Sequence, residues 1–104
     1  MSVFAAAVDE LFADPNIGRD AVWRVAGSGA GVNVRVVFRA PDTTASFGGG
    51  RFVAQSRFID VRILEVSVLA PGDTFEIGSA TYVVQGEPLA DDDKLIWSAE
   101  VRAA

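Results

Sequence analysis

Hydrophobic residues near the start of the chain recur at helical spacing. Four of them follow the i, i+4, i+7, i+8 pattern of one buried stripe: Phe4, Val8, Leu11 and Phe12. The pattern predicts a helix over residues 2–13, with Ser2 as its N-cap. The helix should end before Asp14-Pro15, because the residue that precedes a proline is pushed out of the helical region.

From about residue 20 onward, apolar and polar residues alternate, which is typical of half-buried β-strands. The alternation predicts strands within residues 20–40 and again within residues 58–102. The three glycines of Gly27–Gly31 allow the positive φ angles of a hairpin loop. Pro71–Asp73 is a turn signal ahead of a second hairpin, whose own turn is Gly78-Ser79.

The alternation changes phase within residues 58–69, so that a second set of residues is expected to share a face: Leu64, Val66 and Val68. A β-bulge or a strand break near Ile63-Leu64 would account for this change. One helix followed by about six short strands predicts a single domain over residues 1–104. The expected fold class is mainly β: a small antiparallel β-barrel or sandwich with an N-terminal α-helix and a long central loop.

The predicted central loop covers residues 41–57, which show no clear period. Loops of this length are uncommon in compact domains and are usually functional or disordered. Three successive glycines, Gly48, Gly49 and Gly50, predict that the loop is mobile. Its aromatic and arginine residues are of types favoured at protein interfaces: Phe47, Arg51, Phe52 and Arg57. The alternative is a flexible surface hairpin in which Phe52 belongs to a strand.

The sequence offers few groups for catalysis. It contains no cysteine and no histidine, which excludes disulfides, thiol nucleophiles and the usual general base near neutral pH. Gly27–Gly31 lacks the following helix that a dinucleotide fingerprint requires, and Asp91–Asp93 lacks the ligand spacing of a calcium loop and reads as a solvated turn. Trp23 and Trp97 share the phase of apolar neighbours and are interpreted as core anchors. We therefore expect a protein that is not an enzyme and holds no cofactor or metal.

Charge is distributed unevenly along the chain. The net charge of −5 divides into −3 over residues 1–18, +4 over residues 19–62 and −6 over residues 63–104. The acidic total argues against a dedicated nucleic-acid binder, since such proteins neutralise phosphates with Lys and Arg. Opposite charges on different surfaces would favour copies that meet head to tail in a ring or filament. The alternative is a chance scatter of charges over solvated faces.

The second half of the chain contains a run of residues in a recognisable order. The run is Glu65-Val66-Ser67-Val68-Leu69-Ala70-Pro71-Gly72-Asp73-Thr74-Phe75-Glu76-Ile77-Gly78, followed by Tyr82-Val83-Val84 and then Trp97. It resembles the C-terminal half of lambda-type phage head–tail joining proteins, and the order of helix, strands, long loop and hairpin agrees as well. Similar Gly-Asp turns also occur in other stopper proteins, in tail terminators and in baseplate components.

The resemblance implies a structural virion protein of the head–tail connector: a stopper, or head completion ring, that joins the DNA-filled capsid to the tail. The ring, usually a hexamer of one chain, would contact portal or adaptor proteins on the head side and a tail terminator or tail-tube protein on the tail side, with packaged DNA in its lumen. Carried onto this chain, the contacts between rings fall on Asp42–Ser56 and Ser2–Phe12. The interface candidates are Phe47, Gly48, Gly49, Gly50, Arg51, Phe52, Arg57, Phe4, Arg35 and Arg39.

Two alternatives stay open at this point. One is a tail terminator or another ring that caps the tail tube. The other is a free-standing β-barrel module that binds a peptide, a sugar or single-stranded nucleic acid through exposed aromatic residues. Asp9 and Glu10 stand where a secretory leader requires apolar residues, and no membrane span is expected. We expect assembly in the bacterial cytoplasm and a final place at the head–tail junction of a virion, of a phage, a prophage or a gene transfer agent.

Overall fold

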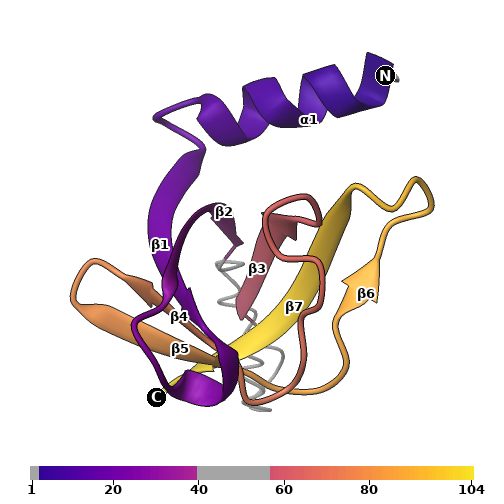
Figure 1. The fold of residues 1–104 in the computed structure, drawn as a ribbon. Coiled ribbons are helices and arrows are strands. Elements are labelled where there is room, and N and C mark those ends of the chain that lie inside the picture. Colours follow the sequence, from indigo (N-terminus) through magenta and orange to yellow (C-terminus); the bar gives the residue numbers. More distant parts are fainter. Residues whose placement is uncertain (1–2, 40–56) are drawn as a thin grey trace, which may run out of the picture.

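Figure 1 shows one α-helix followed by strands that wrap into a barrel. The computed structural model describes residues 3–39 and 57–104, so Ser2 and most of the predicted central loop lie outside the described residues. Arg57, the last residue of that predicted loop, begins a strand. In chain order the elements are α1 (Val3–Ala13), β1 (Gly18–Arg24), the 3-10 helix η1 (Val25–Gly27), β2 (Val32–Arg39), β3 (Arg57–Arg62), β4 (Thr74–Ile77), β5 (Ala80–Val84), β6 (Leu89–Ala90) and β7 (Ile96–Ala103).

The sheet closes on itself because β3 pairs on both of its sides, with β2 and with β7. The strand order is β3-β2-β1-β4-β5-β7-β6, and every pairing is antiparallel. Six strands form the closed barrel, while β6 is a short extra strand on β7. Closure leaves few free strand edges in the described sheet. The prediction of a mainly β fold with one helix near the N-terminus is confirmed, and the architecture is a barrel.

The barrel core is built from the apolar phase of the alternating strands. Its buried strand residues are at most 5% exposed: Ala21, Val34, Val36, Ile59, Val61, Phe75, Val84, Ala99 and Val101. Burying each of the larger side chains stabilises the fold by about 1.5–3 kcal/mol. Trp23 and Trp97 pack against this core, as the sequence pattern predicted.

One end of the barrel is organised around the carboxylate of Asp73. This side chain is 3% exposed and accepts hydrogen bonds from the indole Nε1 of Trp23 (3.1 Å), the amide of Ala26 (3.0 Å) and the amide of Ala70 (3.1 Å). The three donors belong to β1, to η1 and to the segment between β3 and β4. Asp73 therefore ties together three parts of the chain that meet at this end, which we call the closed end.

The segment after β3 departs from the sequence prediction. β3 ends at Arg62, and the amide of Val66 donates to the carbonyl of Arg62 at 3.2 Å, so a strand break explains the change of phase. This turn directs Val66 into the core, whereas Leu64 and Val68 are 75% and 71% exposed. The expectation that these three residues share a face is therefore wrong. Trp97 fixes the segment over the barrel by donating from Nε1 to the carbonyl of Val66 at 2.9 Å.

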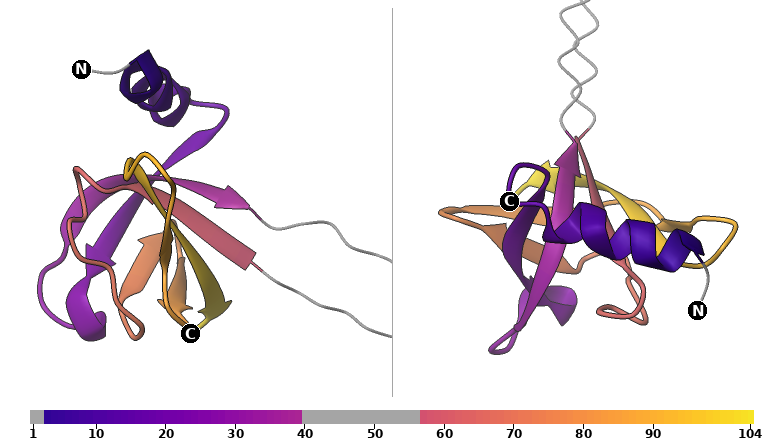
Figure 2. Two further views of the ribbon diagram at one scale, coloured as in Figure 1. Left: turned by 90° about the vertical axis from the view of Figure 1, so that its right-hand side faces the viewer. Right: turned by 90° about the horizontal axis from the view of Figure 1, so that it is seen from above.

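Helix α1 forms a separate layer over the barrel and leads into β1 (Figure 2). Phe12 anchors it and is 1% exposed, but Phe4 is 65% and Leu11 is 43% exposed. The predicted buried stripe is therefore wrong at these two positions. A straight helix contacts a curved barrel along only part of its surface, so the described residues do not bury Phe4 and Leu11.

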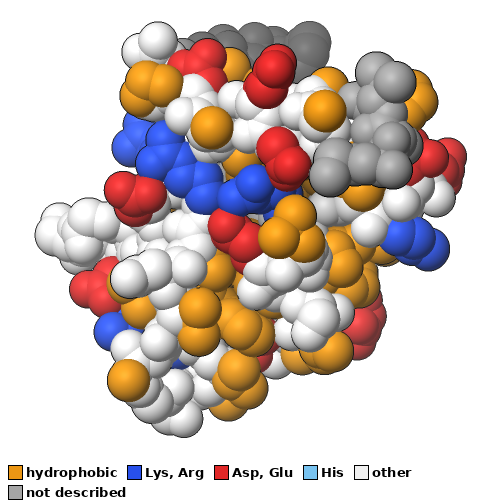
Figure 3. Space-filling view, turned by 45° about the horizontal axis from the view of Figure 1, so that its top comes forward, with side chains coloured by type: hydrophobic (Ala, Val, Ile, Leu, Met, Phe, Trp, Pro, Cys, Tyr) orange, Lys and Arg blue, Asp and Glu red, His pale blue; other side chains and the backbone are white. Residues whose placement is uncertain are grey.

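Two arginines hold α1 on the barrel by polar contacts. Arg35 of β2 donates from Nε to the carbonyl oxygen of Phe12 at 2.7 Å. Arg62 of β3 donates to Asp9 of the helix at 3.0 Å and to Glu65 at 2.6 Å. The guanidinium of Arg62 also lies over the ring of Phe12, 5.4 Å from its centroid. Figure 3 shows the resulting band of basic side chains between the helix, at the top of the view, and the barrel below.

The chain between α1 and β1 has to come very close to the helix for these contacts to form. A Cβ atom on Gly18 would collide with the carbonyl oxygen of Phe12 and would lie 2.8 Å from Nε of Arg35. Glycine at this position therefore permits both the turn into β1 and the hydrogen bond that holds the end of the helix.

Replacing Asp73 with alanine is expected to lower the free energy of unfolding by about 3 kcal/mol, because three hydrogen-bond donors at the closed end lose their acceptor. Urea denaturation followed by tryptophan fluorescence measures this loss. The matched control is Asp93→Ala, which removes an exposed carboxylate and should change stability by less than about 0.5 kcal/mol. A loss below about 1 kcal/mol for Asp73→Ala would contradict this role.

Replacing Arg35 with leucine is expected to loosen α1 without unfolding the barrel. Hydrogen exchange of the helix amides should become roughly tenfold faster, because the bond to Phe12 is lost, while amides of the barrel strands keep their rates. Arg39→Leu is the control, since Arg39 pairs with Asp60 at 2.9 Å on the strand surface. Equal acceleration in both variants, or in the whole barrel, would show that Arg35 does not act on the helix.

Candidate functional site

The described parts of the chain, residues 3–39 and 57–104, contain no group of three or more His, Cys, Asp or Glu side chains that could hold a metal ion. Within the same residues, no helix is long and apolar enough to cross a membrane. The features that remain as candidates are surfaces: the end of the barrel opposite Asp73, the exposed apolar residues of α1 and an acidic turn before β7.

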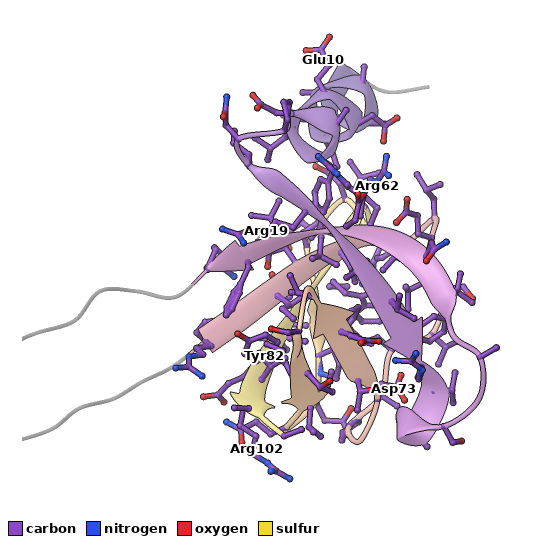
Figure 4. The ribbon with its side chains drawn as sticks, turned by 90° about the vertical axis from the view of Figure 1, so that its left-hand side faces the viewer. Glu10, Arg19, Arg62, Asp73, Tyr82 and Arg102 are labelled. Carbon is purple, nitrogen blue, oxygen red and sulfur yellow. The ribbon has the colours of Figure 1, made fainter. Side chains whose placement is uncertain are left out.

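The end of the barrel opposite Asp73 is not covered by the residues that the structure describes. A hollow of about 500 Å³ is lined there by one residue from each of five strands: Arg19, Phe38, Arg57, Ile77 and Tyr82. Each of them continues the inward phase of its strand past the last core residue. We call this hollow the barrel mouth. Figure 4 shows Arg19 and Tyr82 on the side of the barrel away from Asp73.

The floor of the barrel mouth is aromatic. The rings of Phe38 and Tyr82 meet edge to face, with centroids 4.9 Å apart and an interplanar angle of 85°. Such a pair is rigid and adds to the stability of the barrel by more than its buried area alone. The mouth therefore has a preformed apolar base with two guanidinium groups at its rim.

The two rim arginines differ from four of the five other arginines of the described strands in their electrostatic surroundings. Arg24, Arg35, Arg39 and Arg62 each form an ion pair with an acidic side chain at 3.0 Å or less. Arg19 and Arg57 have no such pair among the described residues. Two unpaired cations on one hollow give it a positive potential that attracts an anionic group.

Helix α1 has two exposed large apolar side chains, Phe4 and Leu11, which we call the helix surface. Between the helix and the barrel lies a small pocket of about 120 Å³, lined by Ala5, Val8, Asp9, Arg62, Leu64 and Leu95. Figure 4 shows Glu10 directed away from the barrel and Arg62 beneath the helix. Exposed large apolar side chains are a common mark of a protein-binding surface.

The acidic turn, Asp91–Asp93, is held in one conformation. The carboxylate of Asp91 accepts hydrogen bonds from the amides of Leu95 (2.7 Å) and Ile96 (2.9 Å). The bond from Ile96, followed by the other backbone donors, outweighs the opposing effect of desolvation and lowers the pKa of Asp91 below its usual value. Asp92 and Asp93 are exposed and form no ion pair with the described residues.

The interface candidates from the sequence are distributed over several of these surfaces. Arg57 lies at the rim of the barrel mouth and Phe4 on the helix surface. Arg35 is engaged with the helix, and Arg39 donates twice to Asp60 at 2.9 Å, so both guanidinium groups have partners within the chain. The other candidates lie outside the described residues: Phe47, Gly48, Gly49, Gly50, Arg51 and Phe52.

Sequence reasoning did not single out Arg19, Phe38 or Tyr82 as parts of a site. A signal for them was present, because each continues the inward alternation of a strand beyond its last buried residue. Their meeting at one hollow depends on how the strands are staggered around the barrel. Alternation within a single strand does not report that stagger.

Comparison with known proteins identifies the family of this chain. The chain matches the family model described as Phage Head-Tail Attachment protein over residues 1–101, which includes α1 and nearly all of the barrel. A search of curated proteins found no match to the chain. Because the family model spans more than half of the sequence, the chain belongs to the phage head–tail attachment protein family.

Proposed function

We propose that this chain forms the stopper, or head completion, ring that joins the DNA-filled capsid to the tail of a phage or phage-like particle. Membership of the head–tail attachment family supports a head–tail joining role and a place in the virion. The observation that carries the proposal is the match over residues 1–101, which spans the helix and the barrel together and is not limited to one hairpin motif. In the proposed ring, each copy of the chain would contact neighbouring copies, a portal or adaptor protein on the head side and a tail protein on the other side.

The geometry supports a role in docking. The barrel is closed and its core is buried, so it provides a rigid base that need not change shape on binding. The helix surface, in contrast, leaves Phe4 and Leu11 in contact with water, which costs free energy that a partner would recover by covering them. We place the contact with a neighbouring ring on this surface, together with the segment 42–56 that lies outside the described residues.

The described residues supply no alternative chemistry that competes with docking. The acids that pair with arginines are engaged in holding strands and helix together. Trp23 and Trp97 are packed against the core and donate hydrogen bonds within the chain, so neither offers a free stacking platform for a sugar or a base. This favours the connector over the free-standing binding module.

Replacing Phe4 and Leu11 together with serine tests the proposal in a particle-producing strain. The barrel should fold normally, because both side chains are already exposed, but filled heads and separate tails should accumulate where tailed particles form with the unchanged chain. We expect at least a tenfold loss of tailed particles, counted by electron microscopy.

The matched control is the double variant Val25→Ser with Val68→Ser, which removes two comparably exposed apolar side chains outside α1. It should leave the number of tailed particles unchanged. Normal tailed particles from the helix variant, or an equal loss from the control, would contradict the assignment of the docking contact to the helix surface.

A further inference from the structure

We propose that the barrel mouth of one copy of this chain receives the acidic turn Asp91–Asp93 of the next copy. This inference rests on the proposed ring and assigns the two surfaces through which neighbouring subunits would meet. The contact would be heterologous, since it joins two different patches, and such contacts generate closed rings when the rotation between copies closes.

The mouth has the properties of a receptor for carboxylates. Its hollow of about 500 Å³ falls in the usual range of binding pockets. Arg19 and Arg57 stand at its rim without an acidic partner among the described residues, although the other arginine of each strand, Arg24 in β1 and Arg62 in β3, is paired. Two guanidinium groups beside one hollow repel each other weakly, and an inserted carboxylate would remove that repulsion and accept their hydrogen bonds.

The acidic turn has the properties of the matching ligand. Hydrogen bonds from Leu95 and Ile96 to the carboxylate of Asp91, and from the amide of Lys94 to the carbonyl of Asp91 at 3.1 Å, fix the turn. Asp92 and Asp93 then project two adjacent negative charges from a backbone that loses little further freedom on binding. Five of the ten other acids of the described chain are already paired with arginines: Asp9, Asp20, Asp60, Glu65 and Glu76.

One subunit does not fill its own mouth with this turn. The turn directly precedes β7, whereas the far end of β7 borders the mouth through the pairing of Ala103 with Tyr82. β7 has eight residues, and at about 3.3 Å per residue the two features are separated by roughly 20–25 Å. Figure 1 shows the turn at the upper end of β7 and the C-terminus at its lower end. A second copy is therefore the source of the ligand.

Charge reversal tests the contact in a particle-producing strain. The strain's own gene for this chain is deleted, and variants of the chain are supplied in its place. The mouth variant Arg19→Glu with Arg57→Glu, and the turn variant Asp92→Arg with Asp93→Arg, should each reduce tailed particles at least tenfold. Supplying both variants together should restore tailed particles. The acidic mouth of the mouth variant accepts the basic turn of the turn variant, and the unchanged basic mouth of the turn variant accepts the unchanged acidic turn of the mouth variant.

The control is Glu87→Arg, which reverses an exposed charge outside both surfaces and outside α1 and should leave particle numbers unchanged. If deletion of the gene itself does not reduce tailed particles, the proposed function is wrong. If deletion reduces them but either reversal has no effect, or the two variants together do not restore assembly, the proposed function stands and this contact is wrong.

Discussion

Two arginine side chains between the helix and the barrel hold the helix in place and so determine its position on the barrel. Arg35 binds the carbonyl oxygen at the end of α1, and Arg62 binds Asp9 and covers the ring of Phe12. The helix is thus held largely by polar contacts and by one buried aromatic residue. Phe4 and Leu11 remain at the surface, so their apolar area does not stabilise the helix on its own domain. This is the area that the proposed docking contact would cover.

The closed barrel is the rigid part of the molecule on which the helix is held. Pairing of β3 with β7 closes the sheet, and the buried carboxylate of Asp73 joins three segments at the closed end. Among the described residues, the opposite end has no cover, and it carries an aromatic floor and two arginines without acidic partners. One end thus stabilises the fold, and the other is the end that we propose binds the acidic turn of a neighbouring copy. A structural component of a head–tail junction requires both properties, because it must keep its shape while several surfaces are occupied.

Local patterns in the sequence predicted much of the fold but only part of the site. The β4–β5 hairpin and the glycine-containing loop before β2 were correctly predicted, since turn residues and alternation act over a few neighbours. The burial of Phe4 and Leu11 was wrongly predicted, because helical spacing does not reveal how much surface the barrel offers to the helix. The engagement of Arg35 and the meeting of Arg19 with Arg57 depend on residues far apart in the sequence, so they emerged only from the folded chain.

The central claim is that this chain is a ring component at the junction between head and tail, with its helix surface facing a neighbouring ring. A reconstruction of the assembled particle by electron cryomicroscopy tests it most directly. The account predicts density for the barrel in a single ring layer between the portal side and the tail, with α1 against the adjacent layer. Density distributed along the tail tube, or no density for this chain in the particle, would contradict it.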